Sequence, residues 1–167
     1  MKTRSDIPLE ASYSAPDGSG ENPGEFPFTR GRKPNPHSGS WIQRELSGEG
    51  DARRSNEQIR YLLEHGQNGI DFIGDAATQS MLDPDHPLTR ASVGTQGASL
   101  CRKQDYLELF EGVSFDGISV STSVPAPFAL AGLTLAAREK DFPLDQLLGS
   151  VLQPPLYMED CAYAWHV

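Results

Sequence analysis

The chain lacks several features that mark common classes of protein. It has two cysteines, Cys101 and Cys161, whose spacing fits no metal-ligand motif. No apolar run reaches the roughly 18 residues of a membrane span, and residues 1–25 lack the apolar middle of a secretion signal. These absences predict a cytoplasmic protein with reduced thiols, no metal site and no contact with membranes.

Positive charge is also scarce. The 167 residues contain 14 Lys and Arg against 23 Asp and Glu, which gives a formal net charge of -9. Nucleic acids and anionic membranes both bind proteins through a positive footprint, so neither is expected as the main partner. A chain of this length is nevertheless long enough to bury the core of one domain.

Local composition divides the chain into two parts. Residues 1–25 are rich in Pro, Gly, Ser and acidic side chains, so they predict a disordered or extended arm. Residues 26–167 are expected to form the domain. Within it, Ser55 and Gln58 have the form of a capping box at a helix start, and Gly66 suits the end of that helix.

Strands and helices then alternate. Strands are predicted at residues 69–73, 117–123 and 150–152, and further helices at residues 103–111, 126–138 and 141–148. Helix 126–138 is apolar nearly all round, which predicts burial, and Leu144, Leu147 and Leu148 are expected to pack inward. The alternation predicts the α/β class with parallel crossovers. Three strands cannot close an eightfold barrel, which typically needs about 250 residues.

Several motifs occur in a fixed order between residues 26 and 152, and together they resemble the start of the substrate barrel in the methylmalonyl-CoA mutase family. The matches that carry the resemblance are FPFTRG at residues 26–31, Trp41, Arg44, Ser55, Asn56, Asp75, Thr78, Gln79, DPDHPL at residues 83–88, Ser119, Ser121, Thr122 and residues 149–151. The resemblance implies a partial (β/α) TIM-barrel-like domain of parallel strand–helix units over residues 26–167. It also implies an isomerase that rearranges the carbon skeleton of a CoA thioester with adenosylcobalamin.

The resemblance also implies which residues touch the substrate and what is missing. Arg44, Thr78, Gln79, Ser121 and Ser150 fall at matching positions and are expected to bind an acyl-CoA thioester. The family's cobalamin-ligating pattern DxHxxG is absent from this sequence, so no cobalamin-binding domain is expected. Adenosylcobalamin would then act only through a partner chain that completes the barrel, supplies the cobalamin domain, or does both.

The departures from the family pattern are ordered as well. Leu46 stands at the family's tyrosine near the cofactor, Gly74 at a phenylalanine, and Leu152 at a glutamine that contacts substrate. These departures leave three hypotheses open. The chain is a subunit or fragment of an acyl-CoA mutase-type isomerase, competent only with a partner chain; or a non-catalytic remnant or adaptor; or a cobalamin-independent acyl-CoA-binding enzyme.

Asp71 is the candidate catalytic residue. It interrupts the apolar run Ile70–Phe72–Ile73, and a desolvated carboxylate suits a general base. The alternative is a hydrogen-bonded or hydrated aspartate at the mouth of a strand. Asp83, Asp85 and His86 have the residue types of a metal site, but Asp and Pro also make turns, and we interpret this stretch as a structural loop.

Overall fold

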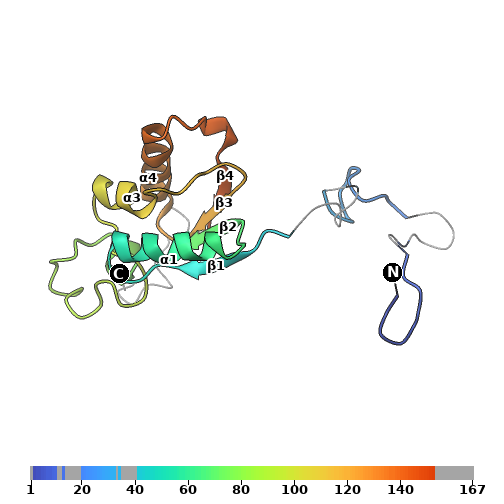
Figure 1. The fold of residues 1–167 in the computed structure, drawn as a ribbon, viewed down its shortest axis with the longest axis horizontal. Coiled ribbons are helices and arrows are strands. Elements are labelled where there is room, and N and C mark those ends of the chain that lie inside the picture. Colours follow the sequence, from blue (N-terminus) through green and yellow to red (C-terminus); the bar gives the residue numbers. More distant parts are fainter. Residues whose placement is uncertain (1, 11–12, 14–19, 33, 35–40, 153–167) are drawn as a thin grey trace. The chain divides into compact units, whose positions relative to one another are not determined.

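The computed structural model describes residues 2–10, 13, 20–32, 34 and 41–152. The chain divides into two compact units, Met1–Trp41 and Ile42–Val167, which are described separately (Figure 1). No helix in the described part of the chain is long and apolar enough to cross a membrane.

The first unit is built from turns. Among its described residues no helix or multi-residue strand occurs, and its backbone is closed by local hydrogen bonds. The FPFTRG motif forms one such turn: the Gly24 amide donates to the Gly31 carbonyl at 2.9 Å, and the Gly31 amide donates to the Phe28 carbonyl at 3.0 Å. The Phe26 and Phe28 rings meet edge to face, and Phe26 is 85% exposed.

The second unit contains a sheet of four parallel strands in the order β1-β2-β3-β4. Its strands are β1 (Arg44–Ser47), β2 (Gly69–Phe72), β3 (Ser119–Thr122) and β4 (Leu148–Val151). Sequence patterning predicted the last three of these and missed β1, which lies beside a Gly/Pro/Ser-rich stretch. Sequential parallel strands linked by helices confirm the α/β class and agree with a partial (β/α) barrel.

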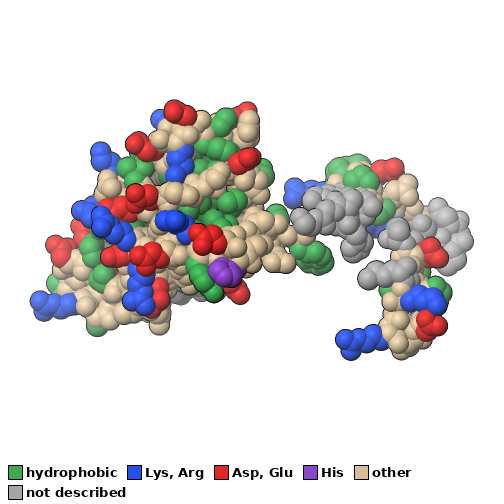
Figure 2. All heavy atoms as spheres, viewed as in Figure 1, with side chains coloured by type: hydrophobic (Ala, Val, Ile, Leu, Met, Phe, Trp, Pro, Cys, Tyr) green, Lys and Arg blue, Asp and Glu red, His purple; other side chains and the backbone are tan. Residues whose placement is uncertain are grey.

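Helices fill the connections between the strands. They are α1 (Ala52–Glu64), α2 (Ala76–Gln79), α3 (Lys103–Leu109), α4 (Ala126–Glu139) and the 3₁₀ turn η1 (Leu144–Gln146). The one-turn helix α2 was not predicted, because four residues are too few to show a helical period. Figure 2 shows that charges of both signs are intermingled over the visible face of the second unit.

The predicted start of α1 is wrong by one turn. Asp51, not Ser55, is the N-cap, and its carboxylate accepts a hydrogen bond from the Arg54 amide at 2.9 Å. Ser55 lies inside the helix, where its hydroxyl donates to the Glu49 carbonyl and accepts from the Glu49 amide, both at 3.0 Å. Both residue types cap helices well; here the incoming backbone places Asp51 at the helix start and uses Ser55 to hold the preceding turn.

The helix predicted at residues 141–148 is also wrong. The structure has only the turn η1 there, and β4 begins at Leu148. Leu147 packs against the core as expected, but Leu144 and Leu148 are 42% and 57% exposed. The backbone of Leu147 is already extended, because the chain must join the edge of the sheet, and this pairing overrides the local helical pattern.

The core lies between one face of the sheet and helices α1, α3 and α4. Residues paired across parallel strands point to the same face. Ile70, Phe72 and Val120 accordingly share one face, and Phe72 meets the Phe110 ring at 5.6 Å in an edge-to-face contact. Helix α4 buries one side only: Phe128 and Leu130 are 52% and 57% exposed, which corrects the predicted burial of this helix.

Candidate functional site

The face of the sheet opposite the core is the candidate site. It is named here the open face, because α1, α3 and α4 all pack on the other side. Strand register arranges its side chains in two rows. The first row is Arg44, Gly69, Ser119 and Leu148, and the second row is Leu46, Asp71, Ser121 and Ser150.

The second row brings together three of the predicted site residues, Asp71, Ser121 and Ser150. Ser121 is 1% exposed, Asp71 is half-buried and Ser150 lies exposed on the edge strand. The Asp71 Oδ1 atom is buried and has no hydrogen-bond partner within the described residues. Since a buried carboxylate oxygen without a partner is costly, this atom is a ready acceptor for a donor brought by another molecule or segment.

Arg44 lies in the first row. Its guanidinium Nη2 donates to the Ser119 hydroxyl at 2.6 Å, so the side chain reaches from β1 across β2 to β3. Ser119 belongs to the family resemblance but was not singled out as a site residue. The alternation Ser119–Ser121–Ser123 was the available signal, since residues two apart on a strand face the same side.

Thr78 and Gln79 lie apart from the rows, on α2 just beyond the carboxyl end of β2. The Thr78 hydroxyl accepts from the Leu100 amide at 3.0 Å, and the Gln79 side-chain amide donates to the Gly74 carbonyl at 2.7 Å. Both side chains therefore brace the loop at the carboxyl end of the sheet. Reactive sites of barrel enzymes lie at this end, so the geometry is compatible with their predicted role in substrate binding.

Asp75 organises the same loop. Its side chain is fully buried, and its two carboxylate oxygens accept from the Thr78 and Gly94 amides, each at 2.8 Å. Its own amide donates to the Ala98 carbonyl at 2.9 Å. One carboxylate thus ties the start of α2 to the segment that returns along the end of the sheet.

The Asp83–His86 stretch forms a turn in the structure. The Thr89 hydroxyl lies within hydrogen-bonding distance of the carbonyls of Asp83, Pro84 and His86, and His86 Nδ1 accepts from the Leu88 amide at 3.2 Å. Within the described residues, no group of three or more His, Cys, Asp and Glu is placed to hold a metal ion. These contacts agree with the interpretation of a structural loop.

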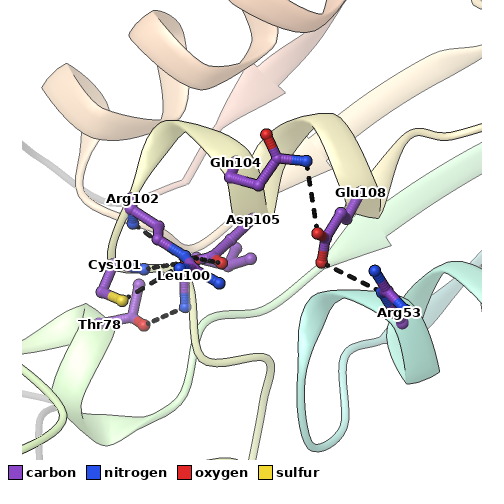
Figure 3. Close-up of polar contacts among 8 residues, drawn as sticks. All are labelled: Arg53, Thr78, Leu100, Cys101, Arg102, Gln104, Asp105 and Glu108. Atoms are coloured by element: carbon purple, nitrogen blue, oxygen red, sulfur yellow. Dashed lines mark hydrogen bonds and ion pairs between the residues drawn. The ribbon is translucent and has the colours of Figure 1, made fainter.

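A second polar cluster surrounds Cys101 at the start of α3 (Figure 3). The Asp105 carboxylate accepts from the amides of Cys101 and Arg102 at 2.9 and 3.0 Å and from Arg102 Nε at 3.0 Å. Burial raises the pKa of the Cys101 thiol, and its hydrogen bond to Asp105 raises it further. Burial also acts to raise the pKa of Asp105, but Arg102 and the two amides outweigh it and lower that pKa. A thiol with a raised pKa is a poor nucleophile at neutral pH.

Two adjoining hollows lie beside this cluster, on the helix side of the sheet. One, of about 190 Å³, lies between α3 and α4 and is lined by Tyr106, Phe128 and Leu135 among others. The other, of about 130 Å³, extends toward Thr78 and Met81. Of the residues predicted to bind substrate or to act in catalysis, Thr78 alone lines either hollow.

Comparison with known proteins gives a consistent result. The family model described as methylmalonyl-CoA mutase matches residues 2–162. The 2-hydroxyisobutanoyl-CoA mutase large subunit of Aquincola tertiaricarbonis is 32% identical over 158 residues, covering 89% of this chain and 28% of that protein. The methylmalonyl-CoA mutase of Rhizobium meliloti (strain 1021) is 32% identical over 153 residues, covering 87% of this chain and 22% of the relative. A probable mitochondrial methylmalonyl-CoA mutase of Caenorhabditis elegans is 30% identical, covering 89% and 20%.

The match therefore spans between 20% and 28% of the length of these relatives. The family model covers nearly all of it, and the parallel strand–helix units and the open face agree with the barrel that the sequence indicated. The chain belongs to the methylmalonyl-CoA mutase family and matches the amino-terminal part of its members.

Proposed function

We propose that this chain forms the first part of the substrate barrel of an acyl-CoA mutase-type isomerase, in the cytoplasm. One observation carries the proposal: apart from Leu46 and Leu148 on its edge strands, the open face holds small and polar side chains. In an ordinary (β/α)₈ barrel, bulky branched residues fill the interior. Here Gly69, Ser119, Ser121 and Ser150 lie on the open face, so a barrel closed around this face would keep room for a narrow ligand such as the CoA arm.

Each predicted residue has a defined part in this proposal. Arg44 offers guanidinium N–H groups to an anionic group of the acyl-CoA. Ser121 and Ser150 line the second row, where their hydroxyls can donate to the ligand. Thr78 and Gln79 stand at the carboxyl end of the sheet, where the acyl group would react.

Asp71 is the candidate for proton transfer. Its Oδ1 is buried without a partner in the described residues and lies in the same row as Ser121. A carboxylate in this position can take up or return a proton from a bound thioester. Its neighbours Ile70 and Phe72 point into the core, so the strand holds the carboxylate firmly toward the open face.

The cofactor is assigned to a partner chain. Adenosylcobalamin, when bound, supplies the radical chemistry of carbon-skeleton rearrangement. The DxHxxG pattern expected to ligate cobalamin does not occur in this sequence, which supports assigning the cofactor to another chain. This chain would instead contribute the cavity that holds the thioester and keeps water away from it.

The edges of the sheet support the need for further strands. Within the described residues, β1 and β4 each pair on one side only, and Leu46 and Leu148 are 62% and 57% exposed on the open face. Unpaired edges and exposed apolar side chains invite association with more strands. A barrel-completing chain would pair with the free strand edges and cover the exposed leucines.

A second candidate is a cobalamin-independent enzyme that binds acyl-CoA and uses Asp71 as its base. The unpartnered carboxylate favours it, because Asp71 needs no cobalamin to exchange a proton. A non-catalytic adaptor is the third candidate, favoured by Leu46, Gly74 and Leu152 at the family's cofactor and substrate positions.

The deciding experiment measures the native mass of the protein from its own cells and identifies the chains that co-purify. A stoichiometric complex with a barrel-completing or cobalamin-domain chain, active on CoA thioesters with adenosylcobalamin, supports the proposal. A lone monomer or homo-oligomer contradicts it. Asp71→Asn is then assayed in whichever assembly is found: loss of turnover supports proton transfer by Asp71, and unchanged turnover removes this residue from the mechanism.

A further inference from the structure

Arg44 takes an unusual route across the open face. It starts on β1, passes over β2 at Gly69 and ends at Ser119 on β3, where Nη2 donates to the hydroxyl at 2.6 Å. Ser119 is 7% exposed, so the acceptor is fixed by the packing around it. An arginine held at its far end by a buried hydroxyl loses much of the freedom that a surface arginine has.

Gly69 makes this route possible. A Cβ at position 69 would lie 2.4 Å from Arg44 Cγ and 2.9 Å from Ile42 Cγ2, closer than carbon atoms can approach. The backbone of Gly69 is ordinary extended strand, so the glycine is not required by a special conformation. Its role is therefore to leave space for the arginine stem.

The hydrogen bond between Arg44 and Ser119 also separates two opposite charges. Arg44 is held in the first row, whereas Asp71 lies in the second row of the same face. Within the described residues, no carboxylate forms an ion pair with Arg44. An arginine free to swing would meet the nearest carboxylate, and each charge would then neutralise the other. Ser119 instead fixes the guanidinium within its own row.

We propose that Ser119 and Gly69 are positioning residues that hold Arg44 across β2 and keep it apart from Asp71, available to an anionic group of the ligand. The identity of that ligand as an acyl-CoA rests on the proposed function. The positioning itself does not, because it is a property of the free protein. Four of the five guanidinium N–H groups remain for the ligand once one is used on Ser119.

The first test follows the guanidinium directly, by ¹⁵N NMR of arginine side chains in the full chain together with any chains that co-purify. In the wild type, the Arg44 guanidinium should rotate slowly, unlike that of the exposed Arg138. Ser119→Ala and Gly69→Ala should each give Arg44 the fast rotation of Arg138, while Ser119→Thr keeps the hydroxyl and the slow rotation. The control Ser114→Ala, outside the open face, should change nothing. Fast rotation of Arg44 in the wild type, or no change in Ser119→Ala, overturns the proposal.

The second test measures binding of CoA by calorimetry at two salt concentrations. Ser119→Ala should weaken binding by about fivefold to tenfold, and Arg44→Ala by at least as much, since the positioned charge is lost in both. Adding Ser119→Ala to Arg44→Ala should cause no further loss, because Ser119 acts through Arg44. Additive losses would overturn the positioning role. Absence of CoA binding by a wild type whose Arg44 rotates slowly would instead contradict the proposed function and leave the positioning intact.

Discussion

The two faces of the same four strands are built from different residues. On the core face, Ile70, Phe72 and Val120 are at most 2% exposed and pack under three helices. On the open face, the same strands carry Asp71, Ser121 and Ser150, and the large apolar side chains there are more than half exposed. Because burial of apolar area supplies most of the folding free energy, stability is concentrated on one face and polar chemistry on the other.

The largest expected effect comes from the core face. Phe72→Ala removes a fully buried ring that contacts Phe110 and should lower the free energy of unfolding by about 3–5 kcal/mol. Urea unfolding followed by circular dichroism measures this change in the free energy of unfolding. Leu148→Ala on the open face is the matched control. If both variants lowered the free energy of unfolding by similar amounts, the two faces would not differ in their contribution to stability.

The next effect concerns the loop at the carboxyl end of the sheet. Asp75→Ala leaves the partly buried amides of Thr78 and Gly94 without their acceptor and should cost about 2–4 kcal/mol. Hydrogen exchange should rise most at these two amides and less at Ile70. Uniform change across the sheet would mean that Asp75 supports the whole core rather than this loop.

A smaller effect, of opposite sign, is expected on the open face. Asp71→Val removes a buried carboxylate oxygen that has no partner among the described residues and adds a β-branched side chain to a strand. The free energy of unfolding should rise by about 1 kcal/mol, while any turnover is lost. Denaturant unfolding and activity assays are compared on the same preparation. Lower stability in this variant would show that Asp71 has a structural partner.

The smallest effect lies beside α3, outside both faces. Because Asp105 raises the pKa of the Cys101 thiol, Asp105→Asn should increase the thiolate fraction and speed alkylation at pH 8 by about twofold to tenfold. Iodoacetamide rates in a Cys161→Ser background measure it, and Glu108→Gln on the same helix is the control. Equal rates in all variants would show that Asp105 does not act on the thiol.

The core face is the part of the fold that the sequence predicts well. Apolar runs around Ile70 and Val120 and the helical spacing of Tyr106 and Phe110 indicate strands and helices without any tertiary information. Strand β1 escapes this reasoning, because its one large apolar residue, Leu46, faces the open side. Only pairing with β2 makes that segment a strand. The pattern of apolar residues in a sequence reveals elements that bury their side chains. It misses elements that are stabilised mainly by backbone pairing.

Sequence reasoning names several residues that lie on the open face, but not their arrangement. The family resemblance indicated Arg44, Ser121 and Ser150, and the interrupted apolar run indicated Asp71. The contact between Arg44 and Ser119 joins positions 75 residues apart in the chain. No local pattern encodes such a contact, because it depends on strand order and register.

The exposure of Leu46, at one end of the second row, has a consequence for divergence within the family. A position that contributes little to folding can be exchanged without unfolding the protein, so the requirement to fold places little constraint on it. Leu46, at 62% exposure, already differs from the residue expected at this position. Under the proposed function, the exposed positions of the open face are where new acyl specificities can arise at low risk, while the helix-covered face keeps the inherited scaffold in place.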